Sequence, residues 1–281
     1  MDTEALRAWV GRREQRADEI TAAPLAALSA TLDRDDPTPL PGSDVPPLWH
    51  WLFLLPMART SETGPDGHPR RGGFLPPVDL PRRMWAGGRL SFHHALKVGD
   101  EVTRSSTIQN IEVKSGRSGS LVFVTVRHEI ANARGVAISE EHDIVYREAH
   151  VPGAPVAPPH AAPSDAAFSS SIVPNDVLLF RYSALTFNGH RIHYDRKYAT
   201  EVEGYPGLVV HGPLIATLLL ELLRRQHPDI VVKTFAFKAL RASFDLNAFK
   251  VCGRPDGPGR FELWAHDHAD GLTMQATAET A

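Results

Sequence analysis

The stretch HGPLIATLLLELLRR, residues 211–225, decides the fold class of this 281-residue chain. It is apolar on nearly every side, whereas a surface helix keeps one polar face, so it predicts a helix buried against a sheet. Pro213 suits the first turn, where a helix N–H has no partner. Arg224 and Arg225 suit the C-terminal end, where the helix dipole favours positive charge. We therefore expect one long buried helix that begins near His211.

Runs of alternating apolar and polar residues lie in both halves of the chain and are typical of strands with one buried face. They lie near residues 101–113, 121–130 and 136–146 in the first half, and near 231–237, 260–266 and 272–279 in the second. Phe92 and Asp100 are also spaced like Phe237 and Asp245. This weak repeat predicts an α+β fold of two copies, each a helix packed on an antiparallel sheet.

A proline-rich stretch, HVPGAPVAPPHAAPSD (residues 150–165), separates the two halves. It has five prolines and almost no large apolar side chain, which is typical of an extended spacer. The expected organisation is therefore a first domain at 1–149, a linker at 150–165 and a second domain at 166–281. Residues 1–20 mix acids with arginines and lack the apolar core of a signal peptide, so we expect an exposed helix there.

Composition excludes several classes of protein. There are 30 Lys and Arg against 33 Asp and Glu, a formal charge of −3, so no overall positive field would hold a nucleic acid. The single cysteine, Cys252, excludes a disulfide framework and a multi-cysteine metal site, and it favours a cytoplasmic protein. The apolar stretches fall short of the ~20 residues that cross a bilayer. The histidine pairs lack the HExxH arrangement and no nucleotide-binding glycine motif is present, so we expect neither a metal nor a cofactor.

The densest group of chemically useful side chains lies in YSALTFNGHRIHYDRKYA, residues 182–199. An imidazole titrates near neutral pH and suits proton transfer, so His190 and His193 are candidates for acid–base chemistry. Gly212 opens the expected helix, and its unpaired N–H is suited to a carbonyl oxygen that gains negative charge. The residues alone leave a second interpretation open, in which this segment is a polar surface loop and Gly212 only begins the helix.

These motifs carry a resemblance to a known family. The pattern Leu-Thr…Asn-x-His-x-Ile-His-x-Asp-x-x-x-Ala, followed by His-Gly-Pro-Leu, resembles the (R)-specific enoyl-thioester hydratases among the MaoC-like hotdog proteins. It is most similar to the subgroup that contains mesaconyl-C4-CoA hydratase and the mitochondrial 3-hydroxyacyl-thioester dehydratases. LWHWLFLLP, GGFLPP and RMWAGGRLSFHHALKVGDEV in the first half resemble the substrate-side hotdog of the same proteins. The resemblance implies a double hotdog fold and a hydro-lyase acting on a 2-enoyl-CoA or a 3-hydroxyacyl thioester.

The resemblance also implies roles for individual residues. In the family motif an Asp and a His five residues apart share the proton transfers, and a Gly N–H holds the thioester oxygen. These positions correspond to His193 and Gly212, but Asn188 stands where the Asp is usual. An amide can orient water but cannot take its proton. We therefore expect His193 to act as general base on a water held by Asn188.

Five further residues are expected to contact the substrate: His190, Arg191, Arg181, Arg241 and His211. If the acyl group is a short branched dicarboxylyl such as mesaconyl-C4, an arginine should pair bidentately with its far carboxylate. The sequence leaves Arg181, Arg191 and Arg241 open for that role. Asp195 is expected to cap the turn DRKYA rather than to orient an imidazole.

Two other functions remain open. One is a non-catalytic acyl-CoA-binding hotdog module, which would tolerate Asn188. The other is an acyl-CoA thioesterase, which is disfavoured because the first acid of the helix, Glu221, lies more than two turns from its start. The expected partner is an acyl-CoA or acyl carrier protein thioester, with the CoA thioester as substrate rather than cofactor. Neither nucleic acid nor membrane is expected as a partner, and pairing of sheet edges favours a homodimer.

Overall fold

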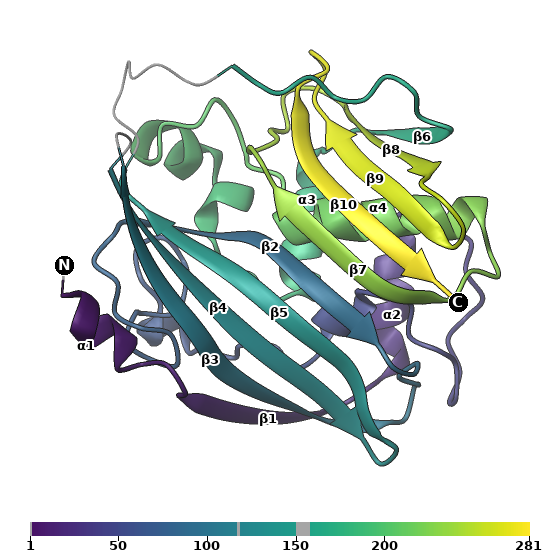
Figure 1. Cartoon of the computed structure of the whole chain (residues 1–281), viewed down its shortest axis with the longest axis horizontal. Coiled ribbons are helices and arrows are strands. Elements are labelled where there is room, and N and C mark those ends of the chain that lie inside the picture. The colour runs from purple at the N-terminus through teal and green to yellow at the C-terminus, as the bar shows by residue number, and fades with distance from the viewer. Residues whose placement is uncertain (1, 117–118, 150–157) are drawn as a thin grey trace. The chain divides into compact units, whose positions relative to one another are not determined.

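A computed structural model of the chain describes residues 2–116, 119–149 and 158–281 (Figure 1). The chain forms two compact units. The N-terminal unit comprises Met1–His150 and Leu185–Gly189, and the C-terminal unit comprises Val151–Ala184 and His190–Ala281. Residues 150–157 of the expected linker lie outside the described residues.

The N-terminal unit is built on an antiparallel sheet with the strand order β1-β3-β4-β5-β2. The strands are β1 (Arg13–Glu19), β2 (Arg82–Phe92), β3 (Glu101–Gly116), β4 (Gly119–Asn132) and β5 (Gly135–Arg147). The helices are α1 (Thr3–Arg7) and α2 (Ala22–Thr31), with short 3-10 turns η1 (Trp49–Leu52) and η2 (Thr60–Glu62). The strands expected near 101–113, 121–130 and 136–146 are confirmed by β3, β4 and β5.

One face of this sheet carries the core of the unit. Val122, Val124 and Val126 alternate along β4 and are at most 1% exposed, and Tyr146 of β5 is paired with Val122 and fully buried. The period of two therefore sends every second side chain inward, as the sequence pattern predicted.

The C-terminal unit is a second antiparallel sheet, ordered β7-β10-β9-β8-β6, with a long helix against it (Figure 1). Its strands are β6 (Phe168–Ile172), β7 (Val232–Ala239), β8 (Phe249–Pro255), β9 (Arg260–His266) and β10 (Leu272–Thr280). Its helical segments are α3 (Asp176–Leu185), η3 (Arg191–His193), η4 (Tyr198–Val202) and α4 (Gly212–Gln226). The three strands expected in this half are confirmed, whereas β6, β8 and α3 were not expected.

The long helix α4 is the one that the sequence predicted. Every residue from 214 to 223 is buried, and the helix contacts β6, β8, β9 and β10. Its internal acid, Glu221, is 3% exposed and pairs with Arg224 at 2.8 Å. The prediction of a buried helix beginning near His211 is therefore confirmed.

The expected exposed helix over residues 1–20 is wrong. Helix α1 ends at Arg7, and Arg13–Glu19 form strand β1, paired antiparallel with β3. Leu6 and Ile20 are 5% and 1% exposed, so both ends of the segment are held in the core. Burial of these two side chains and pairing with β3 override the helical propensity of the charged residues between them. Within the described part of the chain, no helix is long and apolar enough to cross a membrane.

Candidate active site

His193 occupies the last position of the short turn η3 and is 7% exposed. Its Nδ1 lies 2.6 Å from the carbonyl oxygen of Val209. A carbonyl oxygen only accepts, so Nδ1 carries the hydrogen and Nε2 is left as the basic nitrogen. The Val209 N–H in turn donates to the carbonyl of Ile192 at 2.9 Å. These two bonds tie the turn to the segment that leads into α4 and fix the tautomer of the imidazole.

A second imidazole lies face to face with the first. The rings of His193 and His211 are stacked, with centroids 3.7 Å apart and planes 19° apart. His211 is 1% exposed, its Nε2 lies 2.8 Å from the Ser183 hydroxyl of α3, and the Tyr182 ring meets it edge-on at 5.1 Å. Burial, with the charges of His193 and His190, holds the pKa of His211 well below its ordinary value. His211 is therefore a neutral ring at neutral pH.

The N-terminus of α4 follows directly. His211 is the N-cap residue with extended backbone, and Gly212 is the first residue of the helix. The first helical hydrogen bond runs from Ile215 N to the His211 carbonyl at 3.1 Å, so the Gly212 N–H has no partner inside the helix. Its backbone hydrogen and the positive end of the helix dipole favour an oxygen that carries negative charge. The basic nitrogen of His193 and the Gly212 N–H thus belong to one unit, and His211, which stacks on His193, directly precedes Gly212.

Residues 48–245 match the model of the family described as hydroxyacyl-thioester dehydratase type 2. The chain belongs to this family. It is 49% identical over 275 residues to the mesaconyl-C(4)-CoA hydratase of Chloroflexus aurantiacus, covering 97% of this chain and 96% of that relative. The resemblance inferred from the motifs is confirmed.

Solved structures agree on the fold of this family member. HtdX of Mycobacterium tuberculosis has a TM-score of 0.66 at 18% identity, covering 95% of this chain and 100% of that one. Another Mycobacterium tuberculosis protein, described as having a double hotdog fold, has a TM-score of 0.59 at 14% identity, covering 97% of this chain and 96% of that one. The α+β double hotdog fold predicted from the sequence is confirmed.

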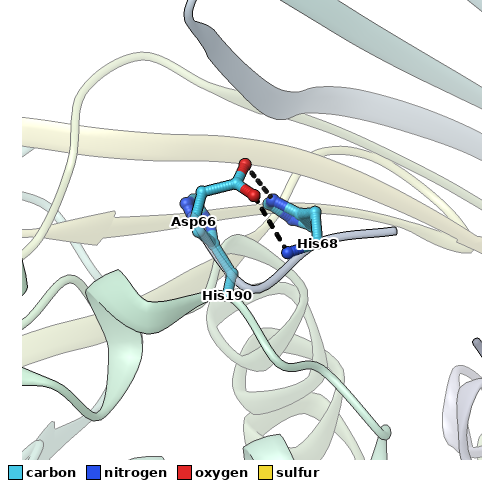
Figure 2. Close-up of side chains that lie close together, drawn as sticks. All are labelled: Asp66, His68 and His190. Carbon is cyan, nitrogen blue, oxygen red and sulfur yellow. Dashed lines mark hydrogen bonds and ion pairs between the residues drawn. The ribbon is translucent and has the colours of Figure 1, made fainter. Parts of the chain in front are cut away.

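Asn188, which stands in the family's Asp position, is half-buried and belongs to the N-terminal unit. Its neighbour Gly189 packs so closely that a Cβ there would lie 2.8 Å from the Gly67 carbonyl oxygen. The turn around Gly67 is held by His68, whose N–H and Nδ1 bond to the Asp66 carboxylate at 3.1 and 3.0 Å (Figure 2). Because His193 belongs to the other unit, its cooperation with Asn188 stays a prediction.

The three arginines expected at the substrate differ in their surroundings. Arg191 pairs with Asp195 at 2.7 Å and lies over the Tyr198 ring at 4.2 Å. Arg241 pairs with Asp267 at 3.0 Å and lines a cavity of about 270 Å³ in the C-terminal unit. Arg181 is exposed on α3. Two of these guanidinium groups thus already hold a carboxylate of the protein, and contact of any of the three with substrate stays a prediction.

Asp195 and His190 lie on either side of His193 in the sequence. Asp195 accepts the N–H of Tyr198 at 3.0 Å, so the predicted cap is confirmed. That bond and the Arg191 guanidinium lower the pKa of Asp195. His190 is half-buried, and its ring meets the His193 ring edge-on at 5.4 Å.

Sequence reasoning missed Ser183 and Val209, which hold the two imidazoles. Ser183 lies within the quoted segment, but nothing in its spacing shows that its hydroxyl reaches a ring 28 residues away. Val209 acts through its backbone carbonyl, which carries no side-chain signal at all. Only the antiparallel approach of the 208–210 segment to Phe244 and Ser243 places that carbonyl.

Proposed function

We propose that this chain adds water to a 2-enoyl-CoA, or eliminates it from the 3-hydroxyacyl thioester, with His193 as general base. The observation that carries this proposal is the bond from His193 Nδ1–H to the Val209 carbonyl, which leaves Nε2 basic in the unit that also presents the Gly212 N–H. Hydro-lyase activity on CoA thioesters agrees with the family to which the chain belongs.

The mechanism needs one base and one oxyanion donor. His193 Nε2 takes a proton from water as the water oxygen bonds to the β-carbon of the enoyl group. The electron pair of the double bond moves toward the thioester, and the carbonyl oxygen gains negative charge beside the Gly212 N–H. The enolate then collapses, and the α-carbon takes the proton back from His193 Nε2–H. One water is added in all, and Asn188 orients it without exchanging a proton.

The substrate we propose is a short branched dicarboxylyl-CoA such as mesaconyl-C4-CoA. The support is the 49% identity to a relative with that activity across nearly the whole length of both chains. We also propose that the enzyme is a cytoplasmic homodimer that works without a cofactor, and that its thioester is carried by CoA. Sedimentation of the purified protein and turnover after dialysis against a chelator test the dimer and the absence of a metal.

Thioester hydrolysis is disfavoured by the structure of α4. A thioesterase of this fold would need a carboxylate near the start of the helix, and Glu221 lies in its third turn. The Glu221 carboxylate is also buried and paired with Arg224, so it is not free to activate water.

Loss of the ultraviolet absorbance of a conjugated enoyl thioester tests the proposal directly. Crotonyl-CoA and mesaconyl-C4-CoA are offered separately to the wild type, to His193→Ala and to His160→Ala, whose histidine is exposed. We expect absorbance to fall with the wild type and His160→Ala, and a loss of about 10²–10⁴ in rate with His193→Ala. Tight binding without an absorbance change would contradict the proposal in favour of a binding module, and release of free thiol would indicate a thioesterase.

A further inference from the structure

The two stacked rings differ in what surrounds their nitrogens. His193 has its Nδ1 bonded to the Val209 carbonyl, so Nε2 is its basic nitrogen. His211 is anchored to Ser183 through Nε2, while its Nδ1 is buried without a hydrogen-bond partner among the described residues. His193 can therefore gain a proton, whereas His211 is anchored and stays neutral.

The anchoring of His211 is extensive. The Ser183 bond restrains rotation about the Cβ–Cγ axis, and the Tyr182 ring also contacts the imidazole edge-on at 5.1 Å. Its backbone caps α4, whose residues 214–223 are all buried. Because close-packed interiors have low compressibility, His211 is a rigid surface against which the His193 ring stacks.

The stack also bears on the charge that catalysis creates. When His193 takes a proton from water it becomes an imidazolium, a cation 3.7 Å from the face of a neutral aromatic ring. A cation within about 6 Å of an aromatic face is attracted by the ring's quadrupole, and more strongly where water is excluded. A charged His211 would instead repel it, and burial prevents that charge.

We propose that His211 is a positioning residue whose neutral ring holds the plane of His193 and stabilises its imidazolium form. This inference rests on the proposed function, because it assigns His211 a part in the proton transfer by His193. His211 itself exchanges no proton and need not contact the acyl group, which distinguishes this role from the substrate contact expected from the sequence.

Two further titratable groups of the same unit face the stacked rings. The His190 ring is edge-on to His193, and its positive form would oppose the imidazolium. Tyr182 is fully buried, bonds to Thr217, and has its pKa raised by burial, so its hydroxyl remains neutral. His190 is therefore a second imidazole in contact with His193, and each variant below is also measured in a His190→Gln background.

The test compares His211→Leu with His211→Phe. Both fill the site with a buried apolar side chain, but only phenylalanine keeps an aromatic face. Ser183→Ala is the third variant, since it keeps the imidazole and removes its anchor. Far-UV circular dichroism and thermal melting verify folding, and His211→Met replaces the leucine variant if that one is unfolded.

The first readout is the titration of the His193 C2 proton by NMR, which requires no substrate. With His211→Leu we expect the midpoint to fall by about half a pH unit, because the imidazolium loses its aromatic neighbour. With His211→Phe it should stay within about 0.2 unit of wild type. This readout separates failure of the proposed function from failure of the role given to His211. A wild-type protein that does not hydrate acyl-CoA contradicts the proposed function but leaves the titration result intact.

The second readout is the kinetics of hydration. We expect kcat to fall about tenfold with His211→Leu and about threefold with Ser183→Ala, with KM unchanged within about twofold, because ring placement and not substrate binding is altered. The acid limb of the kcat/KM profile should move to lower pH with leucine and not with phenylalanine. Equal titration midpoints in the leucine and phenylalanine variants, or a rise in KM that accounts for the lost activity, would overturn the proposal.

Discussion

The Glu140 carboxylate and the His50 ring meet inside the N-terminal unit, 3.2 Å apart with each side chain 2% exposed. The carboxylate also accepts Trp51 Nε1 at 2.9 Å and pairs with His142. Burial alone would raise the pKa of Glu140, but the charge of His142 and the bonds from His142 and His50 outweigh it and hold that pKa well below its ordinary value. An ionised carboxylate therefore cross-links η1 to β5.

Glu140→Gln is predicted to destabilise the protein at neutral pH and to flatten its acid denaturation. The folded-state pKa of Glu140 lies below the unfolded value of about 4.3, so its contribution is complete above that pH and disappears as pH falls through the folded pKa. We expect a loss of about 2–4 kcal/mol at pH 7, since one member of a buried charged network is replaced by an amide. Chemical denaturation of both proteins from pH 7 to pH 3 measures the difference in their free energies of unfolding.

Glu141→Gln is the matched control for this prediction. Glu141 is the next residue of the same strand, but it is partly exposed and pairs with Arg89 at 2.7 Å on the surface. Exposed ion pairs contribute about 0–1 kcal/mol to stability, so the pH dependence of unfolding in Glu141→Gln should stay close to that of the wild type. Equal losses from the two substitutions at pH 7 would contradict the role given to Glu140.

Gly189→Ala is predicted to destabilise the N-terminal unit and to disturb Asn188. The new Cβ would lie 2.8 Å from the Gly67 carbonyl oxygen, so backbone must move. We expect a loss of about 1–3 kcal/mol, measured by denaturant midpoint, together with a lower kcat. Gly73→Ala is the control, because there a Cβ meets nothing within 4 Å among the described residues. Equal midpoints for the two variants would show that the loop yields without strain.

The sequence predicted the elements whose burial is continuous or strictly alternating. Helix α4 is buried along residues 214–223, and β4 alternates inward valines, so composition and period alone were sufficient. Strand β1 was misread because its charged residues, REQRADE, give no apolar period. The pairing of β1 with β3 depends on backbone hydrogen bonds and on the burial of Ile20, which follows the strand. Both are tertiary interactions that the local sequence does not show.

The candidate site could be predicted only where a side chain carries the signal. The motif singled out His193, Gly212 and Asp195. The spacing repeat singled out Asp100 and Asp245, but it did not show that Asp100 accepts the nearby Lys97 N–H at 2.9 Å whereas Asp245 accepts the distant Leu208 N–H at 2.8 Å. The stacking of His211 on His193 depends on how the segment before α4 approaches η3. No spacing in the sequence encodes that approach.

Asp245→Ala is predicted to reduce both stability and activity. Its buried carboxylate holds Leu208, the residue before the Val209 carbonyl that fixes His193. Without this carboxylate the Leu208 N–H loses its partner, and we expect the free energy of unfolding to fall by about 1–3 kcal/mol. The His193 imidazole also loses its alignment. Asp245→Asn keeps an oxygen that can accept that N–H, so it should lose less stability and less activity than Asp245→Ala. Arg196→Ala keeps the Leu208 bond and removes the half-exposed arginine that pairs with Asp245 at 2.6 Å and with Asp176 at 2.7 Å. A kcat as low as that of Asp245→Ala would therefore indicate that the ion pairs of Arg196, and not the Leu208 bond, hold the site.

Gly212→Pro is predicted to abolish most of the hydratase activity while leaving the fold intact. Proline is tolerated in the first turn of a helix, and the preceding His211 already has the extended backbone that proline requires (φ −61°, ψ 129°). The substitution deletes one N–H, and loss of one oxyanion donor costs about 10²–10³ in kcat. Gly212→Ala keeps that N–H and should retain kcat within about tenfold, so the pair separates the hydrogen bond from the added bulk. Initial rates with crotonyl-CoA, together with melting temperatures, give the measurement. Equal activity of the proline and alanine variants would remove Gly212 from the mechanism and place the donor to the thioester oxygen elsewhere.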